Sequence, residues 1–315
     1  MKVMKIFFAT DLHGSEICWK KFIKAGEFYG VDVLILGGDM TGKALIPIIK
    51  QNNGHYKLTF LENEYDLSTQ EEVQHWIRTI QNKGYYPYVT STEEVKELSD
   101  SREKVDKLFL DMMLETIKRW MDYADEQLSG KNIRCYVCPG NDDHFEIDEV
   151  IRQSKLVKHV EGELIEIDKH YEMISTGWSN PTPWNTPREE PEEKLAERIE
   201  KLVGKLSGNK NAIFNFHAPP YGSGLDEAPE LTEDLKPKYA GQSLVPVGSK
   251  AVAEAVEKYK PMLGLFGHVH EGKGTTRIGK TLCVNPGSMY EQGVLQGAII
   301  ELKPRKIGSY VLTTG

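Results

Sequence analysis

The sequence is poor in cysteine and lacks a full set of thiolate metal ligands. Its 315 residues include only four cysteines, and the one C-x-x-C pair, Cys135 and Cys138, has no second pair to complete a zinc site. In the extended strand expected there, side chains three residues apart point to opposite faces. We therefore predict that these two cysteines, with Cys18 and Cys283, are reduced core residues and not zinc ligands.

Long apolar runs and basic blocks are also missing. No apolar run approaches the roughly 18 residues of a membrane span, and the apolar part of the N-terminal MKVMKIFFATDLHG is too short for a signal peptide. We therefore expect a cytoplasmic protein with no membrane partner. The net charge of −8, without a Lys/Arg-rich block, argues against long nucleic acids as substrates and leaves nucleotides open.

Short runs rich in β-branched and aromatic residues recur along the chain and predict a mixed α/β fold. The expected strands are Lys5–Thr10, Val33–Leu36, Cys135–Cys138, Glu172–Ser175, Ala212–Phe216, Met262–Phe266, Thr281–Val284, Gly297–Leu302 and Ser309–Leu312. Helical spacing of apolar residues covers Ser15–Tyr29 and Ser249–Tyr259. The mixture favours an α/β (α+β) fold in which a two-sheet mixed β-sandwich is flanked by helices, with residues 1–315 forming a single domain.

Residues 41–131 separate the second strand from the third by far more than an ordinary crossover. The pattern within them reads as a hairpin followed by two capped helices: Tyr56–Phe60 with Glu64–Leu67, a helix opened by Ser68 and Glu71, and one from Ser91 and Glu94 to Leu128. We expect a largely helical insertion that serves as a cap or an oligomerisation element. The apolar stripe of its second helix fits core packing, which is the default, or contact with a second subunit in a homo-oligomer.

Five short polar motifs each follow an expected strand. They are Asp11-Leu12-His13, Gly37-Gly38-Asp39, Pro139-Gly140-Asn141-Asp142-Asp143, His217, and Gly267-His268-Val269-His270. Taken singly, each has an ordinary structural explanation as a turn, a helix cap or a packed histidine. In extended chain, however, residues two apart point to the same side, so D-x-H and H-x-H can each direct two donors at one metal ion.

The five motifs together are more specific than any one of them. Five of the nine histidines fall in or beside them: His13, His144, His217, His268 and His270. On a mixed sheet, catalytic groups collect on the loops at one edge of the strands. Mixed Asp, Asn and His donors suit manganese, iron or zinc and argue against a thiolate site.

The order D-x-H, G-D, G-N, H, G-H-x-H, which runs from Asp11 to His270, resembles that of the calcineurin-like metallophosphoesterase superfamily. The segment Ser179–Glu190 (SNPTPWNTPREE) also resembles a loop of predicted phosphoesterases related to the Icc group. The resemblance implies two divalent metal ions, with manganese favoured over iron and zinc. It implies that one ion is held by Asp11, His13 and His270 and the other by Asn141, His217 and His268, with Asp39 bridging them.

One position departs from the pattern of the superfamily. Many members carry a histidine directly after the asparagine, and that histidine helps to protonate the leaving group. Here Asp142 stands in its place, followed by Asp143, which we expect to orient a ligand imidazole. The catalytic candidates are therefore Asp142, His217 and His144, the last of which either replaces the missing histidine or packs on the following helix.

These expectations describe an enzyme that hydrolyses phosphodiester or small phosphomonoester bonds with metal-activated hydroxide. Diesters are favoured because the leaving-group histidine is displaced, and the substrate would be a small phosphoester or nucleotide-like molecule. The alternatives are a metal-dependent nuclease, for which Tyr85, Tyr86 and Tyr88 offer stacking surfaces, and a non-catalytic scaffold. Substrate choice is expected to depend on residues 41–131 and on Ser179–Glu190.

Overall fold

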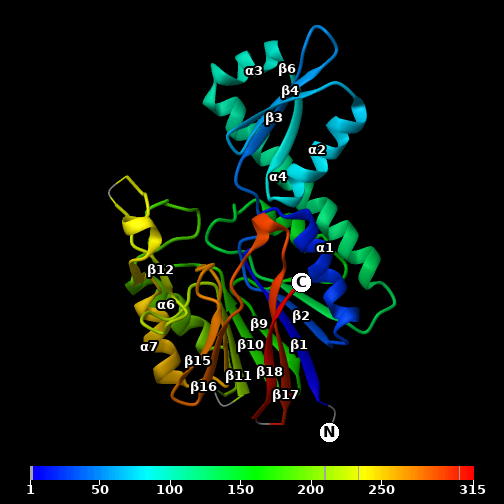
Figure 1. Ribbon diagram of the computed structural model, residues 1–315. Coiled ribbons are helices and arrows are strands. Elements are labelled where there is room, and N and C mark those ends of the chain that lie inside the picture. The colour runs from blue at the N-terminus through cyan, green and yellow to red at the C-terminus, as the bar shows by residue number, and fades with distance from the viewer. Residues whose placement is uncertain (1–2, 209–210, 233, 305) are drawn as a thin grey trace.

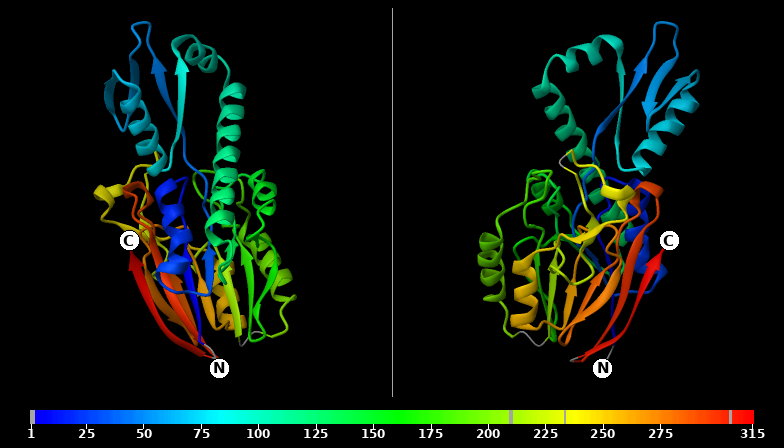
Figure 2. Two further views of the ribbon diagram at one scale, coloured as in Figure 1. Left: turned by 90° about the vertical axis from the view of Figure 1, so that its right-hand side faces the viewer. Right: turned by 60° about the vertical axis from the view of Figure 1, so that its left-hand side comes forward.

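The computed structural model describes residues 3–208, 211–232, 234–304 and 306–315. Two six-stranded mixed sheets share a buried apolar core, and helices cover the outer face of each (Figures 1 and 2). The predicted two-sheet sandwich with flanking helices is therefore confirmed. Among the helices of these residues, none is long and apolar enough to cross a membrane.

The first sheet contains the strands that carry the first three motifs. Its spatial order is β18 (Lys306–Thr314), β17 (Gln296–Lys303), β1 (Met4–Ala9), β2 (Val33–Leu36), β7 (Arg134–Val137) and β8 (Val157–His159). Strands β1, β2, β7 and β8 run parallel, whereas β17 and β18 are antiparallel. Side chains alternate as the period of a strand requires: Ile6 and Phe8 pack toward the second sheet, and Phe7 packs toward the outer helices.

The second sheet carries the two histidine motifs. Its spatial order is β15 (Gly274–Ile278), β16 (Thr281–Asn285), β14 (Leu263–Leu265), β11 (Ala212–Phe216), β10 (Tyr171–Thr176) and β9 (Leu164–Asp168). Strands β10, β11, β14 and β16 are parallel to one another. Parallel strands end at the same edge of a sheet, so the loops after β11 and β14 lie side by side.

Helices pack on both outer faces of the sandwich. On the first sheet these are α1 (Glu16–Phe28), α4 (Arg102–Leu128) and α5 (Ile147–Arg152); on the second they are α6 (Glu192–Val203) and α7 (Lys250–Tyr259). Helices α1 and α4 meet through Trp19 and Trp120, whose rings stack with centroids 4.9 Å apart. The C-terminal half of the α4 apolar stripe is thus core, in agreement with the default interpretation of that stripe.

The long segment between β2 and β7 forms a small sheet of its own above the sandwich (Figure 1). The order of this sheet is β5 (Asn63–Leu67), β4 (Tyr56–Phe60), β3 (Leu45–Lys50) and β6 (Tyr86–Ser91), accompanied by α2 (Gln70–Asn82) and α3 (Thr92–Ser99). The expected hairpin is β4 and β5. Strands β3 and β6 were not expected, and each contains a proline, Pro47 or Pro87, which weakens the strand pattern.

The helices of this segment differ in detail from the prediction. The capping box of α2 is formed by Thr69 and Glu72, one residue beyond Ser68 and Glu71. The expected second helix is two helices, because the Ser101 side chain caps a new helix at Lys104. Figure 2 shows α4 running from this small sheet down to the side of the sandwich. The limits 41 and 131 of the insertion stay a prediction.

Short elements complete the chain: β12 (Glu227–Pro229), β13 (Leu244–Pro246), and the 3-10 turns η2 (Lys238–Gly241) and η3 (Tyr290–Gln292). All four cysteines are buried and free, as predicted. Cys135 packs toward the helices and Cys138 toward the second sheet, so the pair cannot share a metal ion.

Candidate metal centre

The fold brings the predicted ligands to the carboxyl ends of parallel strands in both sheets. They follow the strands in this order: Asp11 and His13 after β1, Asp39 after β2, Asn141 after β7, His217 after β11, and His268 and His270 after β14. The backbones of neighbouring loops are joined directly, since His13 N donates to Asp39 O at 2.9 Å and Gly267 N donates to His217 O at 2.9 Å.

Donor atoms of these side chains lie close enough to share ions. Asp11 Oδ1 is 3.5 Å from His270 Nε2 and 3.8 Å from His217 Nε2. Asp39 Oδ2 is 3.3 Å from His217 Nε2 and 3.6 Å from His13 Nε2. The Nε2 atoms of His13 and His270 are 3.0 Å apart. Two donors that each lie about 2.1 Å from one ion cannot be more than about 4.2 Å apart, and every separation here meets that limit.

The donors fall into two main groups, each with ligand atoms within 4.8 Å of one another: Asp11, His13 and His270, and Asp39, His217 and His268. A third group joins His13, Asp39 and Asp142. Asp39 lies between the main groups, because its Oδ2 approaches His217 on one side and His13 on the other. This is where a bridging carboxylate would lie.

Three atoms of the candidate ligands are buried without a hydrogen-bond partner among the described residues: Asn141 Oδ1, His217 Nε2 and His13 Nδ1. The first two are the atoms expected to face a metal ion. Buried polar atoms are rarely left unpaired, so each such atom calls for an explanation. The other ring nitrogen of His217, Nδ1, donates to Gly37 O at 3.0 Å, which turns Nε2 toward Asp39. A divalent cation would satisfy Asn141 Oδ1 and His217 Nε2, so the side chains fit a metal site.

Four of the candidate ligands have left-handed backbone conformations that non-glycine residues seldom adopt. The φ angles are 55° for Asp11, 41° for His13, 51° for Asp39 and 66° for His268. Each such residue costs on the order of 1–3 kcal/mol, and such strain clusters at functional sites. Strain at the ends of three strands, β1, β2 and β14, is typical of side chains held in place for binding.

Two glycines allow the loops of the centre to approach each other. A Cβ at Gly140 would lie 2.2 Å from Asp39 Oδ1, and one at Gly38, whose φ is 137°, would lie 2.2 Å from His217 Nδ1. Since neither clash leaves room for a side chain, both positions require glycine.

Opposite charges at close range shift the pKa values of the side chains in the centre. Burial disfavours the charged form of His217, but the Asp39 and Asp11 carboxylates outweigh it and raise its pKa to about 9. Burial and the nearby charge of His217 lower the pKa of His268 to about 4. Despite burial, the attraction of His217 holds the pKa of Asp11 and of Asp39 well below the usual range. The metal-free centre is therefore anionic at its carboxylates, as a cation site requires.

The loop Ser179–Glu190 supports the asparagine ligand. Asn141 Nδ2 donates to Thr186 Oγ1 at 2.7 Å, and the Thr186 hydroxyl donates to Glu189 Oε1 at 2.5 Å. Asn141 O also accepts from the backbone N of Arg188 at 3.0 Å. The sequence predicted that this loop contributes to substrate choice. In the structure it also holds the side chain of Asn141, a candidate metal ligand.

Arg188 holds the turn that carries Asn141. Its buried guanidinium donates to Asp143 O at 2.9 Å and to His144 O at 3.1 Å, and it pairs with Asp148 at 2.6 Å. The sequence carried no specific signal for Arg188 beyond its place in this loop.

Asp143 does not orient a ligand imidazole, so that expectation was wrong. Its carboxylate instead accepts hydrogen bonds from the backbone N of Met40 at 3.0 Å, of Thr41 at 2.9 Å and of Gly140 at 2.7 Å. These bonds tie the loop after β2 to the loop after β7. Burial and the nearby Asp39 carboxylate raise the pKa of Asp143 to about 6, although the backbone donors oppose this shift.

The two remaining catalytic candidates lie in different surroundings. Asp142 is beside the centre: its Oδ2 is 3.8 Å from His13 Nδ1 and forms an ion pair with Lys43. The His144 side chain is partly exposed, with its ring 6.2 Å from that of Phe109 and its Nδ1 3.9 Å from Glu146. Among the described residues, none of the three metal-binding groups includes His144.

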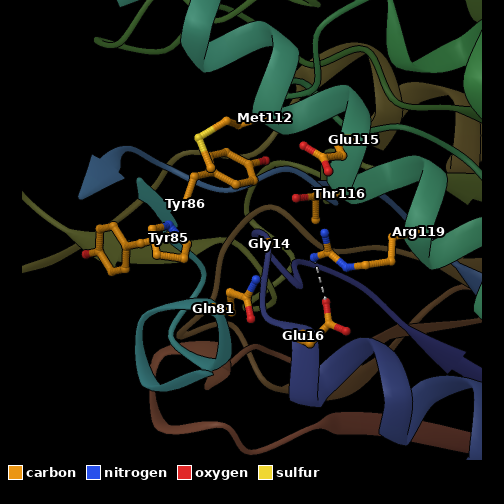
Figure 3. A pocket seen from close by; sticks show the side chains of 10 residues that line it. Gly14, Glu16, Gln81, Tyr85, Tyr86, Met112, Glu115, Thr116 and Arg119 are labelled. Atoms are coloured by element: carbon orange, nitrogen blue, oxygen red, sulfur yellow. Dashed lines mark hydrogen bonds and ion pairs between the residues drawn. The ribbon is translucent and has the colours of Figure 1, made fainter. Parts of the chain in front are cut away.

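A separate cavity of about 150 Å³ lies between helices α1 and α4 and the segment from the end of α2 to the start of β6 (Figure 3). Figure 3 shows Arg119 pointing across it toward Glu16, with which it forms an ion pair of 3.3 Å. The cavity touches the loop of the centre at Gly14, next to His13. Of the described residues that line the cavity, none is a candidate ligand, so it is distinct from the metal centre.

Part of the sequence is similar to a known protein. No family model matches the sequence. The uncharacterised protein MJ1162 of Methanocaldococcus jannaschii is 31% identical over 150 residues, which are 47% of this chain and 61% of that protein. The match thus spans about three fifths of the relative.

Solved structures align along nearly the whole chain. One aligns with a TM-score of 0.56 at 16% identity over 99% of both chains, and TT1561 of Thermus thermophilus aligns with 0.53 at 16% over 100% of this chain and 99% of that one. A novel archaeal phosphodiesterase aligns with 0.40 at 11% identity, over 99% of this chain and 100% of its own. At such identities the likeness concerns the fold alone.

The chain has two facing mixed sheets with Asp/His groups at their carboxyl edge, and it shares its fold with the two structures that align above a TM-score of 0.5. The motif order resembles that of the calcineurin-like metallophosphoesterase superfamily, and membership of that superfamily is a proposal. The Asp/His groups of the chain are suited to binding metal ions. The narrower relation to the Icc group stays a prediction.

Proposed function

We propose that this chain is a metal-dependent phosphoric ester hydrolase. The observation that carries the proposal is the pair of Asp/His groups that meet at Asp39, together with His217 Nε2 and Asn141 Oδ1, which are buried without a hydrogen-bond partner. Two divalent cations, with manganese favoured, would be held on one side by Asp11, His13 and His270 and on the other by Asn141, His217 and His268, with Asp39 shared.

Bound cations would supply Lewis-acid charge for phosphoryl oxygens and a water of lowered pKa. Hydrogen bonds within the chain hold the candidate ligands in fixed positions. Asp39 is fixed by the backbone N of Asp142, which donates to its Oδ1 at 3.0 Å. Asp11 is fixed by Thr10 Oγ1 at 2.7 Å and by the backbone N of His268 at 3.0 Å. Carboxylates fixed in this way need no rearrangement as charge develops in the reaction.

The geometry favours a ligand role for His217 over proton donation. Its Nδ1 proton is committed to Gly37 O, and its Nε2 faces Asp39. Asp142 lies closer to the ligands than His144 does, which makes it the better placed of the two other candidates. Proton donation by His144 stays a prediction.

We favour phosphodiesters over phosphomonoesters, because the chain lacks the histidine that protonates leaving groups in the resembling family. The substrate would be a small phosphoester or a nucleotide-like molecule. We also propose that residues 1–315 form one domain in which residues 41–131 act as a cap or an oligomer contact. The cytoplasmic location stays a prediction.

The test is hydrolysis of bis-p-nitrophenyl phosphate against p-nitrophenyl phosphate with manganese added. We expect activity that chelation removes, that is higher on the diester, and that is lost in Asp39→Ala and His268→Ala. The matched control is Lys258→Met, which breaks an exposed ion pair with Glu200 and should leave activity unchanged. Absence of hydrolysis would favour the scaffold, and digestion of single-stranded DNA would favour the nuclease.

A further inference from the structure

A lysine that no motif marked, Lys43, lies at the open side of the metal centre. Its ammonium group forms an ion pair with Asp142 Oδ2, and the same oxygen lies 3.8 Å from Nδ1 of the candidate ligand His13. Asp142 occupies the position at which the resembling family often carries its leaving-group histidine. Lys43 therefore reaches that position from another loop.

The backbone around Lys43 is held in place. Its own N donates to Gly84 O at 3.2 Å, and the preceding Gly42 N donates to the buried hydroxyl of Tyr86 at 2.7 Å. On the other side, Thr41 donates from both N and Oγ1 to Asp143, at 2.9 and 2.8 Å. Lys43 thus extends from the first residues of the insertion, which are bonded both to the start of β6 and to the loop after β7, unlike a lysine on a free surface loop.

Exposure shows which side of the centre is open. The side chains of Asp11 and His13 are 1% exposed, whereas those of Asp142, His270 and Lys43 are 27%, 32% and 38% exposed. The last three form the rim through which a phosphoester must approach, and its leaving group must depart toward solvent on this side.

Charge at the rim makes the lysine necessary. An ionised Asp142 alone would repel an anionic ester, and it has no proton to donate to a departing oxygen. Lys43 neutralises that carboxylate and adds N–H donors. The ion pair with Asp142 favours the ammonium form of Lys43.

We propose that Lys43, oriented by Asp142, donates a hydrogen bond to the leaving-group oxygen of the substrate and stabilises the negative charge that forms there; this rests on the proposed hydrolase function. In the reaction, the oxygen of water bonds to phosphorus and the ester P–O bond breaks, with its electron pair staying on the departing oxygen. In the overall reaction, one proton of the water is transferred to the departing oxygen, which leaves as an alcohol. Lys43 stabilises that oxygen until it is protonated.

The first test compares leaving groups. For Lys43→Met we expect kcat/KM to fall about 100-fold on methyl phenyl phosphate, whose leaving oxygen is basic and needs stabilisation, but less than about threefold on methyl 2,4-dinitrophenyl phosphate. Lys43→Arg should restore part of the loss, since it keeps a cationic donor. Lys258→Met, which removes an exposed ion-paired lysine, should change neither value.

The second test measures binding without turnover. One oxygen of inorganic phosphate can occupy the leaving-group position, so we expect its Kd, measured by calorimetry on manganese-loaded protein, to rise about tenfold in Lys43→Met. Metal content by mass spectrometry should match the wild type, which separates loss of the lysine from loss of ions.

The outcomes distinguish the two proposals. A wild-type protein that hydrolyses none of these esters would overturn the proposed function and this inference with it. An active wild type with an equal loss on both esters in Lys43→Met, or with unchanged phosphate binding, would overturn the inference about Lys43 alone.

Discussion

Asn141 and Thr186 form a hydrogen bond of 2.7 Å that fixes which end of the Asn141 amide faces the metal centre. The Thr186 hydroxyl donates its single proton to Glu189 at 2.5 Å, so toward Asn141 it can only accept. Nδ2 must therefore lie on the Thr186 side, which leaves Oδ1 buried and without a protein partner. A loop far along the chain thus leaves a neutral oxygen free for the proposed metal ion.

Replacement of Thr186 by valine should weaken metal binding. Valine keeps the shape of threonine but offers no acceptor, so the Asn141 amide loses its fixed orientation. Partners of this kind are typically worth 10–100-fold in metal affinity. We expect a loss of about that size, measured by titration against a chromophoric chelator.

Thr182→Val is the matched control for that experiment. Thr182 also donates to Glu189, at 2.6 Å, but its contacts do not include Asn141. Its replacement should leave metal affinity within about twofold of the wild type. Equal losses in the two variants would show that the whole loop has moved, and would contradict a specific role for Thr186.

Removal of Arg188 should destabilise the fold strongly. Its buried guanidinium bonds Asp143 O, His144 O and the carboxylate of Asp148. Loss of one partner of a buried pair costs about 3–5 kcal/mol. We expect a drop of that size in the free energy of unfolding of Arg188→Met, measured in urea.

Arg198→Met serves for comparison, since Arg198 forms an ion pair with Glu190 but is partly exposed. Such pairs contribute about 0–1 kcal/mol. If both variants lost the same stability, Arg188 would have no special anchoring role.

The ion pair between Asp148 and Arg188 should contribute less to the stability of the fold at low pH. Burial opposes the charge of Asp148, but hydrogen bonds from His159 and Arg188 prevail and lower its pKa below the ordinary value. A carboxylate with a lowered folded pKa stabilises the fold above its unfolded pKa of about 3.9, and loses that stabilisation as the pH falls through the folded value.

The free-energy difference between wild type and Asp148→Asn should therefore be constant from about pH 5 to 7 and shrink below about pH 4. Urea unfolding at several pH values measures it. A difference that grew in acid would contradict the assignment.

Metal addition should stabilise the protein. Manganese that binds only the folded state raises the free energy of unfolding by about 2.7 kcal/mol at 100 times its Kd. The thermal midpoint should rise in the wild type and in His144→Ala, whose side chain lies outside the metal-binding groups, but not in Asp39→Ala. A rise that survived in Asp39→Ala would place the ions elsewhere.

Strand periodicity explains why the sandwich could be predicted. Val33–Leu36 and Ala212–Phe216 were placed at their observed limits, because buried strands of β-branched and aromatic residues bounded by turns leave a clear pattern. Strands β3 and β6 left no such pattern in the sequence, because Pro47 and Pro87 interrupt them. Each of the two strands forms by pairing with the other. Neither strand is recognisable without its neighbour.

The sequence alone identified which residues could bind metal, through their donor types and their positions after expected strands. The alternation of extended chain does not place these side chains, because Asp11, His13 and His268 have left-handed φ angles. Only the tertiary structure decided what orients and surrounds them: Thr186 beneath Asn141, Arg188 across the turn, and Lys43 on Asp142. Each of those contacts joins residues 45 or more positions apart in the chain. Local spacing contains no information about such contacts, since they exist only once the sheets have packed and their loops meet.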